Sequence, residues 1–178
     1  GYLAEWRGLN VTPRQILITA GAADATETCI RTLAARGDRI ALEDPGYPPL
    51  RRFVRAMGME AEWLPVGDDG ARLPAASRMA RPPVVAVLTP SSQFPLGGAM
   101  PTRRRLDFLK WAEDTGGWIV EDDYDSEFRY AGRPIPALAS FDQAGRAIYV
   151  GSFSKIFSET LRLGFLALPP NLVPRFAD

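Results

Sequence analysis

The chain alternates between short aliphatic runs and longer amphipathic stretches, and this alternation limits the folds open to it. Seven runs are rich in β-branched and aliphatic residues, as strands are: residues 15–19, 39–43, 61–66, 84–90, 118–123, 147–151 and 163–168. Three stretches have helical periodicity: residues 23–36, 50–58 and 102–117. Strands that alternate with helices in this way predict an α/β fold, a mostly parallel (mixed) sheet sandwiched by helices.

The two longest helical stretches carry their apolar residues on one side. The expected buried face of residues 23–36 is Thr26, Cys29, Ile30 and Leu33. The expected buried face of residues 102–117 is Leu106, Leu109 and Ala112, and Gly116 ends that helix. The intervening run "VVAVLTP" is apolar throughout, as expected of a strand that is buried on both faces.

Three other segments lead to weaker expectations. Tyr2, Leu3 and Trp6 recur at roughly helical spacing near the start of the chain. Residues 67–83 are polar and predict a loop, and the prolines in residues 129–142 predict an extended surface loop without helix. The three arginines at 103–105 begin a helix, where the macrodipole disfavours cations, and we interpret them as a solvated face rather than a nucleic-acid patch.

Composition excludes several kinds of chemistry. The 178 residues suffice for one domain with its own core, and 21 basic residues balance 21 acidic ones, so no net field attracts nucleic acid or a membrane. With no histidine, this chain cannot form a Ser-His-Asp triad or a His-based zinc site. The single cysteine, Cys29, suits a reducing cytoplasm. No apolar run approaches membrane-spanning length, and the start "GYLAEWRGLN" indicates an excerpt of a longer protein.

Polar clusters follow four of the predicted strands. These clusters are "TAGAADA" (19–25), "DPGYPP" (44–49), "EDDYD" (121–125) and "GSFSK" (151–155). In open parallel sheets, ligands bind at the carboxyl ends of the strands. The four clusters are therefore expected to meet at one binding site.

The last cluster contains Lys155, one of only two lysines in the chain. Lysine acts as a nucleophile when its amine is neutral, or holds a bound aldehyde as an imine. Ser152 and Ser154 offer hydroxyl groups beside it, and Arg162 offers a guanidinium suited to a phosphate dianion. Together these residues describe a site for an aldehyde that carries a phosphate. A solvated lysine on a loop remains the alternative.

The acidic stretch "EDDYD" has three possible roles. Its carboxylates could bind Mg²⁺, or they could form a solvated or helix-capping cluster. Alternatively, one buried aspartate could keep a proton on the nitrogen of a pyridine ring, so that the ring accepts charge from an adjacent carbanion. The residues of this stretch leave the three roles open.

Two long motifs carry a resemblance. "TPSSQFPLGGAMPTRRRLDFLKWAEDTGGWIVEDDYDSEFRYAGRPIPAL" and "IYVGSFSKIFSETLRLGFLALP" resemble the MocR family of bacterial transcription regulators, which belongs to the GntR superfamily. In that family a winged helix-turn-helix domain precedes a domain similar to fold-type I, pyridoxal-phosphate-dependent aminotransferases. The resemblance spans nearly the whole chain and implies that residues 1–178 are part of the large pyridoxal-phosphate-binding domain. The DNA-binding domain would lie upstream and the small C-terminal domain downstream.

The resemblance implies a role for each motif residue. Lys155 would hold pyridoxal 5'-phosphate covalently, Asp122 would pair with the ring nitrogen, and Tyr124 would contact the 3'-oxygen. Tyr47 would stack on the ring. The phosphate would be held by backbone groups of Ala22 and Ala23 at a helix N-terminus, and by Ser152, Ser154 and Arg162. For Tyr47 a core aromatic beside a Pro-Gly turn is the alternative.

Two departures from the resembled pattern bear on function. Phe94 in "QFPLG" stands where aminotransferases carry an asparagine that contacts the 3'-oxygen, and a phenylalanine cannot donate that hydrogen bond. Glu159 brings an extra carboxylate near the phosphate residues, and we expect it to face solvent or a partner subunit.

Three functions are compatible with the sequence. The first is an effector-sensing, pyridoxal-phosphate-binding domain of a cytoplasmic, homodimeric regulator that responds to an amino compound and binds DNA through the upstream domain. The second is a catalytically active aminotransferase, with Lys155 also moving the proton. The third is a cofactor-free α/β domain whose acidic stretch binds Mg²⁺.

Overall fold

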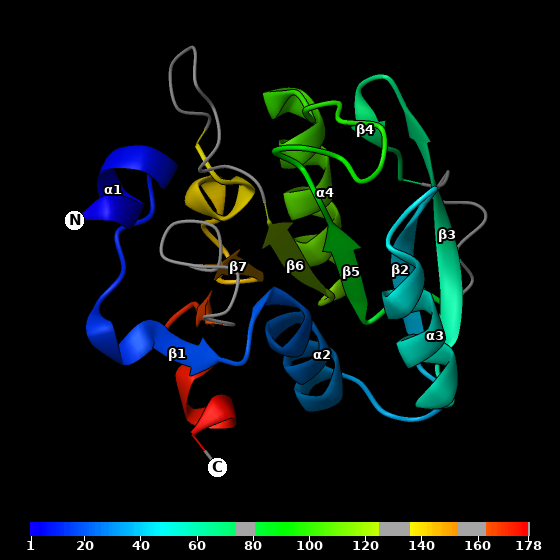
Figure 1. Ribbon diagram of the computed structural model, residues 1–178, viewed down its shortest axis with the longest axis horizontal. Coiled ribbons are helices and arrows are strands. Elements are labelled where there is room, and N and C mark those ends of the chain that lie inside the picture. Colours follow the sequence, from blue (N-terminus) through cyan, green and yellow to red (C-terminus); the bar gives the residue numbers. More distant parts are fainter. Residues whose placement is uncertain (74–80, 125–135, 153–162, 178) are drawn as a thin grey trace.

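The computed structural model describes residues 1–73, 81–124, 136–152 and 163–177. Within them the chain forms one mixed sheet of eight strands in the order β1-β8-β7-β6-β5-β2-β3-β4 (Figure 1). The strands are β1 Ile16–Thr19, β2 Arg39–Asp44, β3 Glu60–Gly67, β4 Gly70–Ala71, β5 Val85–Leu88, β6 Trp118–Asp123, β7 Ala147–Ser152 and β8 Gly164–Ala167. The predicted α/β class is confirmed.

The centre of the sheet is parallel. Neighbouring strands among β3, β2, β5, β6 and β7 run in the same direction, whereas β8 is antiparallel to both β7 and β1, and β4 is antiparallel to β3. Two antiparallel steps through β8 leave β1 pointing the same way as β7. The carboxyl ends of β1, β2, β5, β6 and β7 therefore share one edge of the sheet.

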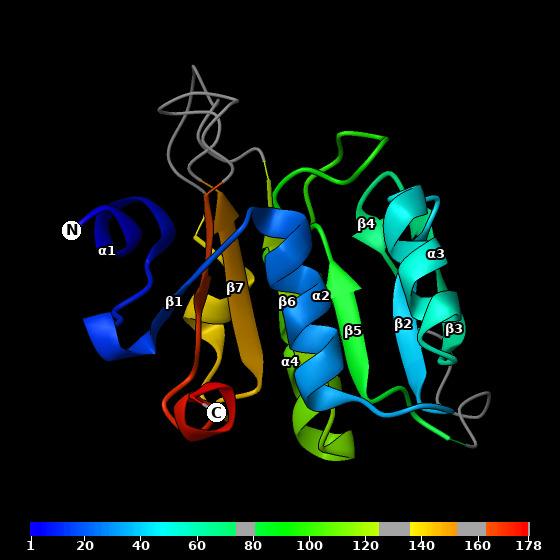
Figure 2. The ribbon, with the colours of Figure 1, turned by 60° about the horizontal axis from the view of Figure 1, so that its bottom comes forward.

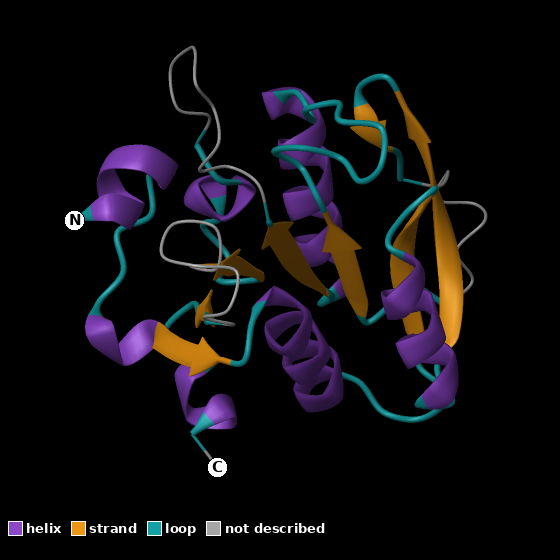
Figure 3. Ribbon diagram, viewed as in Figure 1, coloured by secondary structure: helices purple, strands orange, loops and turns teal. Residues whose placement is uncertain are grey.

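Helices cover both faces of the sheet. The helices are α1 Tyr2–Arg7, α2 Ala22–Leu33, α3 Pro48–Ala56 and α4 Thr102–Thr115, with short 3-10 helices at Pro13–Gln15, Leu138–Phe141 and Val173–Phe176. Helices α2 and α3 lie on one face and α4 on the other, as Figures 2 and 3 show. The buried face predicted for α2 is confirmed, since Thr26, Cys29, Ile30 and Leu33 are all buried.

Several element boundaries differ from the sequence expectation, and one strand lies in a stretch expected to be a loop. Helix α3 begins at Pro48 rather than Leu50. Proline is tolerated in the first turn of a helix, because the backbone N–H groups there have no acceptor within the helix and the missing N–H costs no hydrogen bond. Helix α2 ends at Leu33, before the predicted stop at Gly37. The polar stretch expected to be a loop includes strand β4, which pairs with the end of β3.

The buried face of α4 differs from the prediction. Leu106 is 47 % exposed, whereas Arg105 is 1 % exposed and lies on the buried stripe with Phe108, Leu109 and Ala112. Positions 105, 108, 109 and 112 follow the i, i+3, i+4, i+7 spacing of one helix face. The Arg105 guanidinium donates to the backbone carbonyls of Met100, Pro136 and Pro90. The interpretation of all three arginines as a solvated face was therefore wrong for Arg105.

One other sequence expectation was also wrong. Residues 136–142 do not form an extended surface loop: Ala137 and Leu138 are fully buried, and a 3-10 helix spans Leu138–Phe141. The Glu121 carboxylate accepts both N–H groups at the start of that helix, those of Leu138 and Ala139, each at 2.9 Å. The helical spacing of Tyr2, Leu3 and Trp6 is confirmed by α1, in which both aromatic residues are exposed, Trp6 at 53 %, and the buried residue is Arg7. In the part of the chain that the structure describes, no helix could cross a membrane.

Candidate functional site

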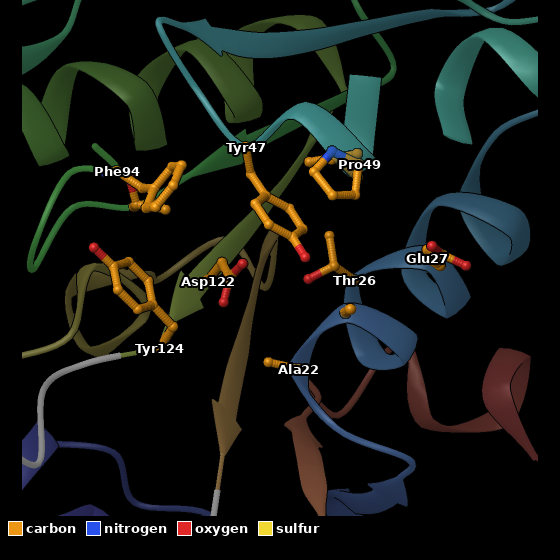
Figure 4. A pocket seen from close by; sticks show the side chains of 11 residues that line it. Ala22, Thr26, Glu27, Tyr47, Pro49, Phe94, Asp122 and Tyr124 are labelled. Carbon is orange, nitrogen blue, oxygen red and sulfur yellow. The ribbon is translucent and has the colours of Figure 1, made fainter. Parts of the chain in front are cut away.

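A pocket of about 280 Å³ opens at the edge of the sheet where the parallel strands end. It lies between the start of α2, the start of α3 and the end of β6 (Figure 4). Its lining is Ala22, Ala23, Thr26, Glu27, Tyr47, Pro49, Leu50, Thr89, Phe94, Asp122 and Tyr124. Three of the four clusters that the sequence places after strands therefore contribute directly to this pocket.

Five predicted site residues line the pocket together: Ala22, Ala23, Tyr47, Asp122 and Tyr124. A sixth, Ser152, ends β7 two residues after Val150, which pairs in register with Asp122. Ser152 is therefore on the same face of the sheet as Asp122. The remaining three, Ser154, Lys155 and Arg162, lie outside the described residues, as does Glu159.

Asp122 forms the polar end of the pocket floor. Alternation along β6 places it on the same face as buried Val120, facing α2. Its Oδ1 atom is buried and has no hydrogen-bond partner among the described residues. Burial, followed by repulsion from Asp123 and Glu43, raises the pKa of the Asp122 carboxyl to about 7. A buried carboxylate oxygen without a donor is costly, so the pocket has a place for a donor that a ligand would bring.

The same alternation separates the three acidic side chains of the stretch. Asp123 lies on the opposite face of β6, where it pairs with Arg7 at 2.8 Å and accepts a hydrogen bond from Tyr149. Glu121 is also on that face and caps the 3-10 helix Leu138–Phe141. The described residues contain no group of three metal-ligating side chains. Asp122 and Asp123 point to opposite faces of β6 and therefore do not converge on one cation.

Three aromatic rings form the rim of the pocket. Phe94 contacts Tyr47 edge-on at a centroid distance of 5.9 Å and Tyr124 at 6.2 Å. Tyr47 is 46 % exposed and projects over the space beside Asp122, as Figure 4 shows. It is therefore not a core aromatic, and its ring is available to stack on a planar ligand.

A buried polar network holds two of these rings in place. The Glu43 carboxylate at the end of β2 accepts hydrogen bonds from the Thr89 backbone and hydroxyl and from Gln93. Gln93 also donates to the carbonyls of Pro45 and Phe94, which connects the loop carrying Tyr47 to the loop carrying Phe94. Burial raises the pKa of the Glu43 carboxyl above its ordinary value. This network was not predicted from the sequence, although the acid at the end of the aliphatic run "RIALE" was a usable signal.

The start of α2 forms the corner of the pocket beneath Ser152. Gly21 precedes the helix with a φ of 101°, in the region that favours glycine, and its carbonyl accepts the first helical N–H, that of Ala25. A Cβ atom on Gly164 would lie only 2.5 Å from the carbonyl carbon of Gly21. Strand β8 therefore approaches the start of α2 so closely that only glycine fits at position 164. Since Gly164 pairs with Ser152, the serine lies beside the unsatisfied N–H groups of this helix start, which attract anions.

Thr26 contributes a second buried polar atom that has no partner among the described residues. The residue is 3 % exposed, and its hydroxyl points into the space between Tyr47 and Asp122 (Figure 4). A threonine in a helix usually bonds back to the carbonyl four residues earlier. Here the hydroxyl faces the pocket instead, where it can contact a ligand.

We expect Thr26→Val to stabilise the ligand-free protein by about 1 kcal/mol, because valine has the same shape and removes an unsatisfied buried hydroxyl. Chemical unfolding of the full-length protein measures this change. Thr26→Ser, which keeps the hydroxyl, serves as the control. A Thr26→Val variant that is clearly less stable than native protein would show that the hydroxyl has a partner in the folded state.

The geometry defines a class of ligand. A carboxylate without a donor lies at the floor, an aromatic ring lies above, and a helix N-terminus with an adjacent serine lies at one corner. These groups fit a flat heteroaromatic ring with a protonated nitrogen at one edge and an anionic substituent at another. The described residues therefore fit pyridoxal phosphate.

The chain belongs to the aminotransferase class I and II family, whose model matches residues 2–178. Among curated proteins it is 39% identical to a probable rhizopine catabolism regulatory protein, MocR, of Rhizobium meliloti, over 98% of this chain and 35% of that protein. It is 38% identical to the pyridoxine biosynthesis transcriptional regulator PdxR of Corynebacterium glutamicum, over 94% of this chain and 36% of that protein. The chain thus spans about a third of the length of these relatives.

Solved structures with this fold include aminotransferases. The alpha-aminoadipate aminotransferase LysN of Thermus thermophilus, solved with N-(5'-phosphopyridoxyl)-L-leucine, superposes with a TM-score of 0.86 at 30% identity. The match covers 98% of this chain and 46% of that one. The fold family is pyridoxal-phosphate-dependent, which agrees with the ligand class that the pocket geometry defines.

Proposed function

We propose that this chain is the pyridoxal-phosphate-binding, effector-sensing domain of a bacterial transcription regulator. The observation that carries the proposal is the buried Asp122 oxygen without a donor, located below Tyr47 in the pocket. Identities of 38–39% to two regulators over almost the whole chain support the regulatory role. Residues 1–178 would be part of the large cofactor-binding domain.

Each predicted site residue receives a role under this proposal. Asp122 holds the proton on the ring nitrogen, Tyr47 stacks on the ring, and Tyr124 donates to the 3'-oxygen. The helix start at Ala22 and Ala23 binds the phosphate together with Ser152. Ser154, Lys155 and Arg162 complete the set from outside the described residues, with Lys155 as the covalent attachment. When bound, the cofactor supplies an aldehyde that accepts amines and a ring that accepts electrons.

The partners follow from this role. The effector is an amino compound, because an aldehyde cofactor recognises amines. DNA is bound through a helix-turn-helix domain upstream of this chain, and the regulator acts as a homodimer in the cytoplasm. The effector changes the contacts around the cofactor and shifts the orientation of the DNA-binding domain, because it binds the two arrangements with different affinity.

A catalytically active aminotransferase is the second candidate, favoured by the 30% identity to a solved aminotransferase. Phe94 weighs against it. Its ring lies on the rim between Tyr47 and Tyr124 and has no polar group that could hydrogen-bond to a cofactor oxygen. The resemblance places an asparagine at that position in active aminotransferases, so a contact that tunes the cofactor is missing.

One experiment separates the two candidates. The full-length protein, loaded with pyridoxal phosphate, is incubated with a panel of amino donors and keto acids, and its affinity for operator DNA is measured in parallel. We expect an amino compound to change both the cofactor absorbance and the DNA affinity without sustained turnover. Turnover at about 1–10³ per second, the range of ordinary enzymes, would contradict a pure sensor.

A further inference from the structure

Helix α1 contacts the face of β6 that lies opposite the pocket through the side chain of its last residue. Its last residue, Arg7, is 3 % exposed, pairs with the Asp123 carboxylate at 2.8 Å and donates to the Ser91 hydroxyl at 2.7 Å. The Arg7 carbonyl also accepts the N–H of Ala137 at 2.9 Å. Arg7 thus connects α1 to β6, to the loop after β5 and to the segment before the 3-10 helix Leu138–Phe141.

The charge of Asp123 is balanced inside this cluster. Besides Arg7, its Oδ2 atom accepts the hydroxyl of Tyr149, a residue that is 2 % exposed. The Arg7 guanidinium also lies 5.7 Å from the centre of the Tyr149 ring. A second carboxylate, Glu121, is 3.9 Å from the guanidinium. Among the described residues, Arg7 is the cation that pairs with both of these buried carboxylates.

Asp123 is the direct neighbour of Asp122. Because side chains alternate along a strand, one faces α1 and the other faces the pocket, separated by the backbone of β6 alone. The charge of Asp123 raises the pKa of the Asp122 carboxyl after the larger effect of burial, and Glu43 on β2 adds to it. Other titratable groups that line the pocket are Glu27 on α2, Tyr47 and Tyr124. Arg7 is placed to offset the charge of Asp123.

We propose that Arg7 is a positioning residue for Asp122, so that docking of α1 against β6 and cofactor binding in the pocket strengthen each other. The inference rests on the proposed function, because it requires a cofactor ring nitrogen on Asp122. A ring that arrives with its nitrogen protonated pairs directly with an ionised Asp122, whereas a neutral Asp122 carboxyl must first release its proton to solvent. Without Arg7, the unbalanced charge of Asp123 keeps a proton on Asp122 up to higher pH. Because coupling free energies are reciprocal, a bound cofactor in turn stabilises the docked α1.

The first test measures the affinity of the full-length protein for pyridoxal phosphate by absorbance, from the acidic to the alkaline side of neutrality. We expect Arg7→Met to weaken binding at neutral pH by about tenfold, because more of Asp122 then holds a proton. Binding should recover as the pH rises. Arg7→Lys keeps the charge and should retain most of the affinity, and Arg14→Met, at an exposed arginine, is the control.

A double variant distinguishes charge from structure. In Arg7→Met with Asp123→Asn the charge next to Asp122 along β6 is removed, so we expect affinity near the native value at neutral pH. This variant also lacks the buried Asp123 charge, whose direct partner at 2.8 Å is lost in Arg7→Met and which could prevent that variant from folding. If the double variant binds as weakly as Arg7→Met, with an unshifted pH dependence, the coupling is overturned.

Hydrogen exchange gives a readout that does not depend on affinity. Cofactor loading should slow amide exchange in residues 2–9 of the native protein and leave it unchanged in Arg7→Met. Equal protection of α1 in the free and loaded native protein would contradict the coupling. A native protein that binds no pyridoxal phosphate would instead refute the proposed function, so the two failures are distinguishable.

Discussion

Replacing Asp122 by asparagine should weaken pyridoxal phosphate binding by about 10- to 150-fold, equivalent to the roughly 1.5–3 kcal/mol of a hydrogen bond to a charged group. Asparagine keeps the size of the side chain but cannot balance a protonated ring nitrogen. The same variant should be more stable than native protein when both are free of cofactor and the pH is above neutral. Opposite effects on ligand binding and on folding stability are expected where a residue that binds the ligand destabilises the ligand-free fold.

The sign of the stability change follows from the pKa of Asp122. Its folded-state pKa is raised from 3.8 to about 7, so the folded protein holds the proton more tightly than the unfolded chain. The stability that this tighter proton binding contributes is complete below 3.8, the pKa of Asp122 in the unfolded chain, and is lost as the pH rises through about 7. Asparagine does not titrate, so Asp122→Asn avoids the loss. Burial also raises the pKa of the Glu121 carboxyl to about 7. Glu121 is present in both proteins, so its contribution to the pH dependence of stability cancels in the comparison.

Chemical unfolding of the cofactor-free, full-length protein at about pH 5 and about pH 8 measures this difference. We expect the advantage of Asp122→Asn over native protein to be larger at the higher pH. Asp114→Asn, at an exposed α4 residue that pairs with Lys110, is the matched control. Unchanged cofactor affinity in Asp122→Asn would refute the role of this residue, whatever the stability result.

Replacing Arg105 by methionine should destabilise the fold by about 3 kcal/mol or more, because unsatisfied buried groups cost about 1–3 kcal/mol each. The guanidinium donates to Met100 at 2.9 Å, Pro136 at 2.7 Å and Pro90 at 2.8 Å, and methionine can satisfy none of these carbonyls. These bonds join the start of α4 to the loop after β5 and to the segment before the 3-10 helix. The result is measured as the free energy of unfolding.

Arg103→Met is the control for this prediction. Arg103 lies two residues earlier in the same helix and is exposed, so its replacement should change stability by no more than about 0.5 kcal/mol. Equal stability of the two variants would show that the three carbonyls find water or other donors when Arg105 is removed.

Local patterns were sufficient to predict the sheet and the place of the site. Runs such as "VVAVLTP" are continuous because β5 is covered on both faces, and α2 shows its apolar side at helical spacing. The polar clusters after β1, β2 and β6 meet because parallel strands end at one edge of the sheet. The clusters that contain Asp122, Tyr47 and Tyr124 were therefore predictable from the strand pattern, whereas the family resemblance singled out these three residues within them.

The features that could not be predicted from the sequence depend on contacts between segments that are distant along the chain. Arg105 looks like one of three solvated arginines until the loop containing Pro90 and the segment containing Pro136 surround it. Leu138 follows two prolines and is buried because Glu121 caps its helix from a strand 17 residues away. Arg7 lies beside exposed Trp6, and only the fold brings it to Asp123. Periodicity within one segment carries no information about such partners.

Borohydride reduction of the full-length protein with bound pyridoxal phosphate, followed by peptide mapping, tests the central claim most directly. The chain contains two lysines, and Lys110 is an exposed α4 residue that pairs with Asp114 at 3.0 Å, so it serves as an internal control. We predict a stable pyridoxyl label on Lys155 and none on Lys110. A folded protein that takes up no label at Lys155 would contradict the assignment of this domain as a pyridoxal phosphate site.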